Sequence, residues 1–148
     1  MVKNVGDILR EKGTAVYSVS PEDSVYDALK LMAEKNVGAL VVFDGDRLAG
    51  MISERDYARK IVMKDKLSKE TMVKEIMTTE VLVVNPAMDL DECMELITRK
   101  RLRHLPAVEN DRVLGIISIG DIVKGIIDHK ELVIEQLQSY IKGFQTKR

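Results

Sequence analysis

The sequence predicts an α+β protein made of two tandem β-α-β-β-α repeats followed by a C-terminal helix. Three observations lead to this prediction. The chain repeats itself at a spacing of 65 residues, each copy has one segment with apolar residues at helical spacing, and each copy then shows two apolar strands joined by a polar turn. Few aromatic residues are present, 4% of the chain, so the predicted core is aliphatic.

The internal repeat defines the domain organisation. Residues 17–62 align with residues 82–127 without a gap, and twelve of these 46 positions are identical. A copy of about 60 residues buries too little surface to be comfortably stable alone, so we expect the copies to share a core. By repeat, the chain divides into residues 1–66, which include an N-terminal helical turn, residues 67–130, and a C-terminal helix and tail at 131–148.

Each copy opens with a short helical turn, predicted at Val5–Arg10 and Val73–Met77, and an extended segment that ends at Pro21 or Pro86. An amphipathic helix follows, because its apolar residues recur at i, i+3, i+4 and i+7. These residues are Val25, Ala28, Leu29 and Met32 in the first copy and Leu90, Cys93, Met94 and Ile97 in the second. Ser24 and Asp89 are the predicted N-caps of these helices.

Two strands and a second helix complete each copy. The segments ALVVF and LPAV precede polar turns, and the return strands are predicted at Leu48–Ser53 and Val113–Ser118. The closing helices are predicted at Tyr57–Met63 and Ile122–Tyr140. Their apolar content predicts a homodimer in which they pack against a second copy, through Ile61, Val62, Ile122, Val123, Ile126 and Ile127.

Composition and charge exclude several classes of function. The chain has 148 residues, 45% hydrophobic and 32% charged, with a net charge of −1, which argues against nucleic acid as a partner. No apolar run approaches the roughly 20 residues of a membrane helix, and the N-terminus lacks the apolar core of a secretory signal. With a single cysteine and no such signal, we expect a cytoplasmic protein that is not bound to membranes.

One motif occurs twice, as G-x-x-S-x-x-D in Gly50–Asp56 and Gly115–Asp121. Ser and Asp at this spacing form a capping box at a helix start. The same residues also suit a ligand, because a helix N-terminus attracts phosphate and a carboxylate one turn later can accept both hydrogen bonds of a ribose diol. From these residues alone, both interpretations stay open.

A basic cluster precedes the second apolar strand pair. Arg101, Arg103 and His104 lie at the entry to this strand, whereas the equivalent segment of the first copy, NVGAL, has no charge. A solvated basic face is one interpretation and a phosphate site is the other. The asymmetry between the copies favours the phosphate site.

Catalytic motifs are missing from the sequence. It contains no G-x-S-x-G, Walker or G-x-G-x-x-G motif, and two histidines with one cysteine give no metal spacing. Cys93 lies on an apolar helix face and is interpreted as a small buried hydrophobe. Neither Asp56 nor Asp121 is accompanied by a nucleophile or an activated base, so we expect no enzymatic activity.

Taken together, the two copies, their G-x-x-S-x-x-D motifs and the segment RLRHLPAV resemble a CBS-domain pair, or Bateman module, of the stand-alone bacterial and organellar type. The resemblance covers nearly the whole chain. It implies a pseudo-twofold axis between the repeats, two ligand clefts, and a regulatory role. It also implies binding of AMP, ADP, ATP, NAD or NADH, with S-adenosylmethionine as a ligand of some relatives, and no cofactor that acts as a catalyst.

The resemblance also implies which residues line the clefts. The first cleft is expected to contain Ser53, Arg55, Asp56, Val81, Leu82, Arg101, Arg103, His104 and Pro106. The second is expected to contain Val16, Tyr17, Lys35, Asn36, Gly38, Ala39, Ser118, Gly120 and Asp121. Lys35 is the only cation expected in the second cleft, so this cleft should bind AMP more weakly or accept a bulkier dinucleotide.

The sequence therefore predicts an energy- or redox-sensing module that binds an adenine nucleotide and regulates an unidentified partner protein. The alternative is a dimerisation or scaffolding module that regulates its partner without a ligand. The choice among AMP, ATP and NAD stays open, as do the partner and the direction of regulation.

Overall fold

The computed structural model describes residues 2–144, and the side chains of residues 2–139. The chain forms two compact units. The first-repeat unit comprises residues 15–82, and the second-repeat unit combines residues 1–14 with residues 83–148. Helices and strands alternate in both units, as the α+β prediction requires.

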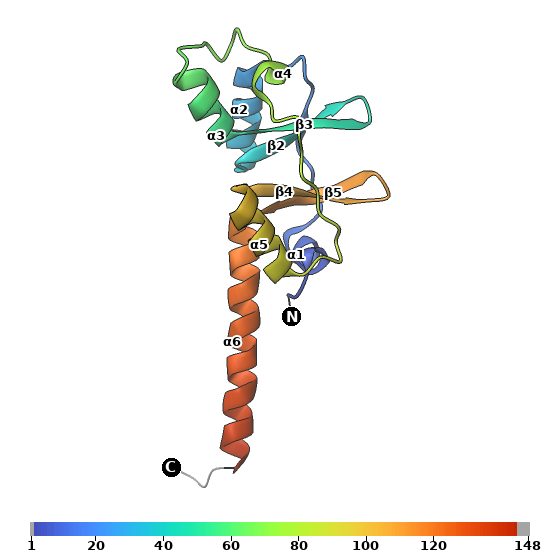
Figure 1. The fold of residues 1–148 in the computed structure, drawn as a ribbon, viewed down its shortest axis with the longest axis vertical. Helices are drawn as coiled ribbons and strands as arrows, with labels where there is room; N and C mark the ends of the chain where they lie inside the picture. The colour runs from blue at the N-terminus through green and yellow to red at the C-terminus, as the bar shows by residue number, and fades with distance from the viewer. Residues whose placement is uncertain (1, 145–148) are drawn as a thin grey trace. The chain divides into compact units, whose positions relative to one another are not determined.

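The first-repeat unit is built around a three-stranded sheet of order β1-β2-β3. Strand β1 runs parallel to β2, and β2 pairs with β3 in an antiparallel hairpin. Its elements are β1 (Ser18–Val19), α2 (Val25–Lys35), β2 (Ala39–Asp44), β3 (Arg47–Ser53), α3 (Glu54–Tyr57), the π-helix η1 (Ala58–Val62) and α4 (Val73–Ile76). Figure 1 labels α2, α3, α4, β2 and β3.

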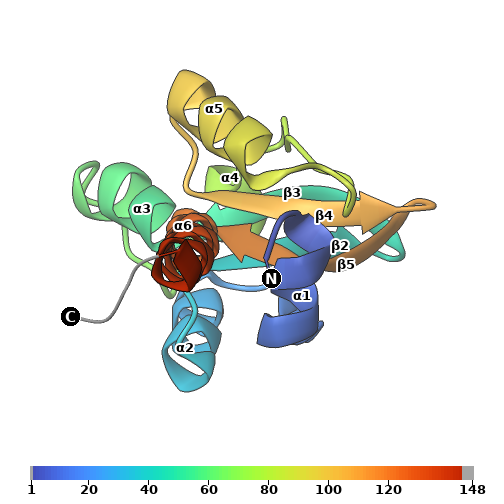
Figure 2. The ribbon, with the colours of Figure 1, turned by 90° about the horizontal axis from the view of Figure 1, so that it is seen from below.

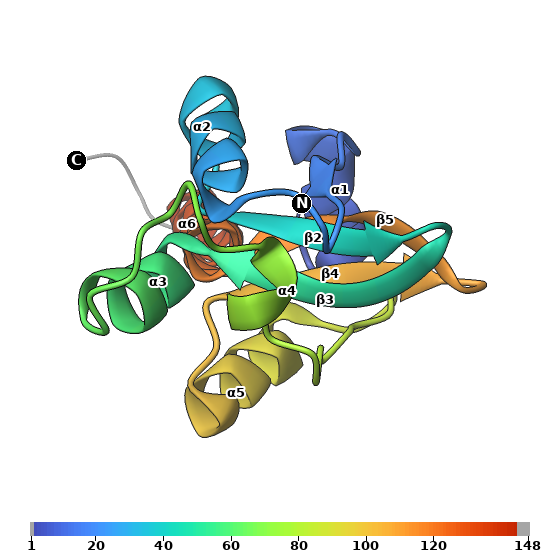
Figure 3. The ribbon, with the colours of Figure 1, turned by 90° about the horizontal axis from the view of Figure 1, so that it is seen from above.

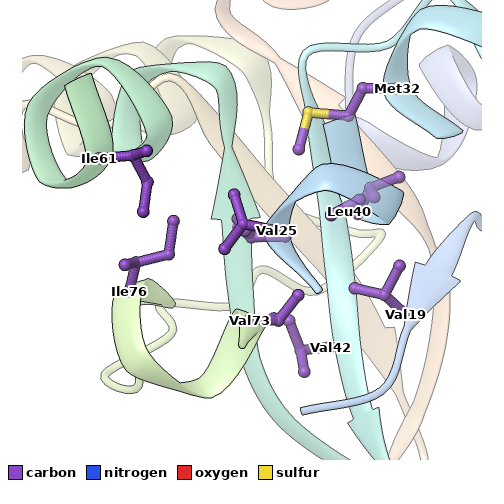
Figure 4. Packing of buried hydrophobic residues seen from close by; sticks show 10 residues of the cluster. Val19, Val25, Met32, Leu40, Val42, Ile61, Val73 and Ile76 are labelled. Carbon is purple, nitrogen blue, oxygen red and sulfur yellow. The ribbon is translucent and has the colours of Figure 1, made fainter. Parts of the chain in front are cut away.

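The core of this unit is aliphatic, as predicted. Helices α2 and α4 lie beside the β2–β3 hairpin in Figure 3, and their apolar side chains meet those of β2 in Figure 4. The fully buried members include Val25, Met32, Leu40, Val42 and Val73. Ile61 of η1 and Ile76 of α4 point toward one another at the edge of this cluster.

The second-repeat unit repeats the hairpin but has a much longer last helix. Its elements are α1 (Val5–Lys12), α5 (Leu90–Lys100), β4 (His104–Glu109), β5 (Arg112–Ser118) and α6 (Ile119–Phe144). Figure 2 shows α1 beside β5. The closing helix of the second repeat and the predicted C-terminal helix are one continuous helix as far as Phe144, because no break occurs in α6, and the predicted tail at 145–148 lies outside the described residues.

The helical turn that opens each repeat packs in the unit of the other repeat. Helix α1 opens the first repeat, yet Val5 and Gly6 donate backbone hydrogen bonds to Met88 and Pro86 of the second. Helix α4 opens the second repeat, yet it contributes to the core of the first-repeat unit. The division expected at residues 66 and 67 therefore describes the sequence repeat, whereas the compact units exchange these turns.

The extended segment before Pro86 forms one parallel bridge, Val84 to Ala107, instead of a strand like β1. In the first-repeat unit, the Val41 N–H donates to the Tyr17 carbonyl at 3.4 Å and extends the β1–β2 ladder. The residue equivalent to Val41 is Pro106, which has no N–H to donate. The missing donor explains why the second-repeat sheet has two strands.

Close backbone contact requires glycine where each exchanged turn crosses a strand. At Gly50, a Cβ atom would lie 2.6 Å from the carbonyl oxygen of Thr78, just after α4. At Gly115, a Cβ atom would lie 2.6 Å from Cδ2 of Leu9 in α1. Both distances are too short for a real contact, so the repeated glycine has a structural reason in both units.

We predict that Gly50→Ala destabilises the protein more than Gly115→Ala. The Thr78 backbone is held by reciprocal hydrogen bonds with Met51, of 2.9 and 2.8 Å, and cannot move away. In Gly115→Ala, the new methyl meets only the end of the Leu9 side chain, and this side chain can rotate away. We expect Gly50→Ala to lower the free energy of unfolding by about 2–3 kcal/mol and Gly115→Ala by less than about 1 kcal/mol. Urea unfolding of both variants measures this, and equal losses would contradict it.

Candidate ligand site at the strand-to-helix junctions

Both G-x-x-S-x-x-D motifs form complete capping boxes where a strand becomes a helix. At the first, the Ser53 N–H donates to Oδ2 of Asp56 at 3.0 Å, and the Asp56 N–H donates to Ser53 Oγ at 3.2 Å. At the second, the corresponding bonds between Ser118 and Asp121 are 2.9 and 3.1 Å. The structural interpretation of the motif is confirmed, and the same bonds fix the direction of each carboxylate.

A lysine is bound to each of these carboxylates. Lys60 Nζ lies 3.2 Å from Oδ1 of Asp56 and donates to the Ile76 carbonyl at 2.8 Å. Lys12 Nζ lies 2.7 Å from Oδ2 of Asp121 and donates to the Ile116 carbonyl at 2.9 Å. The two arrangements have the same form, although the lysines come from different places in the repeat.

Lys12 is the residue that sequence reasoning missed. The expectation that Lys35 is the only cation near Asp121 is wrong, because Lys12 of α1 is hydrogen-bonded to that carboxylate. Lys12 and Asp121 are separated by 109 residues, and they meet because α1 packs in the second-repeat unit. The predicted helical turns at Val5–Arg10 and Val73–Met77 are offset by 68 residues, whereas the rest of the repeat is offset by 65. Only this difference hinted at a structural change there.

Burial and hydrogen bonding act in opposite directions on Asp121. Burial alone raises its pKa, but hydrogen bonds from Lys12 and from the Ser118 backbone outweigh this effect and lower the pKa below its ordinary value. Asp121 is therefore ionised near neutral pH, and its carboxylate accepts hydrogen bonds at the start of α6.

His104 lies at the entry to β4, next to the same junction. It pairs with Ser118 across the hairpin, and the Ile119 N–H donates to the Arg103 carbonyl at 2.9 Å. Burial lowers the pKa of His104, and the charge of Lys12 lowers it further, against the opposing charge of Asp121. His104 is therefore uncharged near neutral pH, and any contact it makes with a phosphate is a neutral hydrogen bond.

The first-repeat unit brings together several of the predicted site residues. Ala39 pairs with Ser53 across the hairpin, and the Glu54 N–H donates to the Gly38 carbonyl at 3.0 Å. Lys35 Nζ lies 5.3 Å from the centre of the Tyr17 ring, a cation–π contact. Gly38, Ala39 and the Ser53–Asp56 box thus form one neighbourhood in this unit.

The remaining site residues differ in accessibility. Arg55, Arg101, Arg103 and Gly120 are exposed, Val16, Val81 and Leu82 are half-buried, and Ala39 and Pro106 are buried in their sheets. Each predicted cleft combines residues of both units, as in the pairing of Asp56 with the Arg101–His104 segment. These pairings stay predictions.

Arg101 and Asn36 occupy equivalent positions at the C-terminal ends of α5 and α2, and both have a left-handed backbone. Their φ angles are both 54°. Asn tolerates this conformation, whereas an arginine adopts it at a cost. The second repeat therefore keeps an arginine at a position where its backbone favours asparagine or glycine.

Metal and thiol chemistry find no support in the part of the chain that the structure describes. Among these residues, no group of three or more His, Cys, Asp or Glu side chains could hold a metal ion. Cys93 is fully buried, as predicted, and burial raises the pKa of its thiol to about 11. The thiol is protonated at neutral pH and is not a nucleophile.

No helix within residues 2–144 has the length and apolarity to cross a membrane.

The chain is similar to several known proteins. The family model described as CBS domain matches residues 5–63 and, separately, residues 73–128. The mitochondrial CBS domain-containing protein CBSX3 of Arabidopsis thaliana is 37% identical over 148 residues, which cover 94% of this chain and 72% of the relative. A solved protein with CBS domains from Burkholderia ambifaria MC40-6 is 51% identical, with a TM-score of 0.82, and the match covers 84% of this chain and 94% of that chain.

A more distant structure adds information about ligands. The CBS domain pair of protein MJ0100, solved in complex with 5′-methylthioadenosine and S-adenosyl-L-methionine, is 24% identical with a TM-score of 0.73. The match covers 82% of this chain and 97% of that chain. At this identity the two chains share the fold.

We predict that Arg101→Asn stabilises the protein and that Asn36→Arg destabilises it. Both positions have a left-handed backbone, so exchanging their residues moves the conformational cost from one repeat to the other. We expect changes of about 0.5–1 kcal/mol in opposite directions. Urea unfolding measures both, and a loss of stability in Arg101→Asn would show that the arginine side chain supports the fold.

Proposed function

Because the chain belongs to the CBS-domain family, with two CBS repeats, we propose that it is a regulatory protein that binds an adenine nucleotide. The observation that carries this proposal is the duplicated junction at which a capping box orients a half-buried carboxylate. AMP, ADP, ATP and NAD(H) are the proposed ligands, and S-adenosylmethionine is less suited because it carries a positive charge. The MJ0100 domain pair, solved with 5′-methylthioadenosine and S-adenosyl-L-methionine, supports the coarser proposal of a ligand that contains adenosine.

The carboxylates have acceptor positions left for a ribose diol. A carboxylate offers about four lone-pair sites. The described contacts of Asp56 use Oδ2 for the Ser53 N–H and Oγ–H, and Oδ1 for Lys60. Those of Asp121 all involve Oδ2, which leaves Oδ1 for a further donor. In our proposal, the 2′- and 3′-hydroxyls of a nucleotide donate to these oxygens.

The exposed arginines supply the charge for a phosphate. Arg101 and Arg103 are exposed at the entry to β4 and keep a full positive charge, unlike His104. We propose that they bind the phosphate of a nucleotide whose ribose is held by Asp56. The proposed role is regulatory and not catalytic, and the regulated protein is a further proposed partner.

Helix α6 supports the proposal of a homodimer. Ile127, Ile134 and Leu137 are 50%, 53% and 56% exposed, and with Val123 they recur at spacings of four, seven and three residues along one stripe. Such spacing is typical of a coiled-coil seam, and a second copy offers the same stripe. Two residues of the predicted interface are placed differently: Ile61 and Ile122 are buried within their own units and are not available to a partner.

The same stripe also favours the second candidate function, a dimerisation module that regulates its partner without a ligand. The two candidates differ in one property. A ligand-independent module needs the α6 stripe and not the carboxylates, so substitutions at the two sites separate them.

We predict that Asp56→Asn and Asp121→Asn each remove one AMP-binding event in isothermal titration calorimetry. Asn keeps one acceptor for the capping bond but loses the charge and the second oxygen. Asp27→Asn is the matched control, because Asp27 holds the same helix position after Ser24 in α2. Unchanged AMP binding in both site variants would leave only the capping role and would refute the proposal.

We predict a dimer in sedimentation velocity at tens of micromolar, and a monomer for Ile134→Glu. Burying two like charges in a coiled-coil seam costs several kcal/mol. Gln136→Glu adds the same charge elsewhere on α6 and should leave the dimer intact. A wild-type monomer, or dissociation by both substitutions, would contradict this interface.

A further inference from the structure

We propose that Lys12 is a specificity-determining residue, which makes the Asp121 junction select phosphorylated adenosine ligands over uncharged ones. This inference rests on the proposed function and deepens it by assigning the ligand class of one junction to a single side chain. It changes the expectation from the sequence, in which this site had only Lys35 as a cation and was the weaker site for AMP.

The first argument is the geometry of Lys12. Its ammonium is held by two acceptors of the second-repeat unit, Oδ2 of Asp121 at 2.7 Å and the Ile116 carbonyl at 2.9 Å. An ammonium has three donors, so one N–H remains for a ligand. The Lys12 side chain is also 41% exposed, which leaves the charge accessible. A cation is therefore fixed beside the carboxylate that is proposed to accept the ribose.

The second argument is the balance of charge around the junction. Lys12 of α1 neutralises Asp121 of α6, and His104 of β4 is uncharged because of burial and the nearby lysine. With Lys12 present, these three groups have no net charge, and without it they have a net charge of −1. Lys12 therefore removes the repulsion that Asp121 would otherwise exert on an anionic ligand.

The third argument is that α1 holds Lys12 firmly. Val5, Ile8 and Leu9 of the same helix are buried in the second-repeat unit, so the end of α1 cannot drift away from the junction. The Asn4–Asp7 capping box fixes the start of the helix. A charge on such a rigid element acts on a ligand without a large ordering cost.

The interaction is large enough to measure. Two unit charges near a protein surface interact several times more strongly than the same charges in bulk water. Solvent and salt reduce this interaction at a half-exposed side chain. We therefore expect Lys12 to contribute at least about fivefold to the affinity for AMP, and nothing comparable to the affinity for adenosine, which has no charge.

The test compares AMP and adenosine as probes by isothermal titration calorimetry of the full chain. Lys12→Met removes the charge and keeps the aliphatic stem, and Lys12→Arg restores the charge. Arg10→Met is the matched control, because Arg10 lies on the same helix but pairs with Asp7. Thermal unfolding of each variant shows whether α1 remains packed.

We expect Lys12→Met to reduce the preference for AMP over adenosine at least about fivefold, with adenosine affinity unchanged within about twofold. Lys12→Arg and Arg10→Met should keep the wild-type preference. Raising the salt concentration from 50 to 500 mM should weaken the wild-type preference and affect that of Lys12→Met much less.

Other outcomes overturn the inference in distinguishable ways. An equal loss for both probes would show that Lys12 only positions Asp121. Tighter adenosine binding in Lys12→Met would show that the lysine competes with the ribose, and no change would make it a bystander. If the wild-type protein bound neither probe, the proposed function itself would fail. Binding that does not change when Lys12 is substituted would instead refute only the role of Lys12.

Discussion

The close passage of a helical turn over a strand glycine determines how both units are organised. The Thr78 backbone can approach its strand only because no Cβ intervenes at Gly50, and the end of the Leu9 side chain occupies the matching position over Gly115. The approach brings the end of each turn to the strand-to-helix junction. Lys60 then reaches the Ile76 carbonyl of α4 in one unit, and Lys12 of α1 reaches the Ile116 carbonyl in the other.

Local patterns were sufficient to predict most of the fold. The repeat, the helix caps at Ser24 and Asp89 and both Ser-x-x-Asp boxes follow from side chains that act within four residues of one another, and all are present. The exchange of the helical turns, and with it the role of Lys12, could not be predicted. Helix α1, for example, packs against a segment about 100 residues further along the chain, and such contacts leave no mark in local periodicity.

The two junctions reach a similar charge by different means. Lys60 lies one turn after Asp56 on the same helical segment, whereas its equivalent in the second repeat is Gly125, which packs closely against Leu90 and Val2. Glycine at that position lets α6 approach its neighbours, and the lysine must then come from α1. In the second repeat, Gly125 thus allows tight helix packing, and Lys12 supplies the cation at the carboxylate. Separate residues meet these two requirements, so the requirements do not compete for one position.

The exchanged N-terminal helix makes the second-repeat unit discontinuous in the chain, with the whole first-repeat unit inserted between its two parts. Residues 15–82 contain all the strands and helices of their own unit, so this unit needs no segment that is made later in synthesis. Helix α1 is made first but gains its partners last, after a loop of roughly 70 residues has been closed, and closing such a loop costs chain entropy. The unit that begins first in the chain is therefore the one that is completed last.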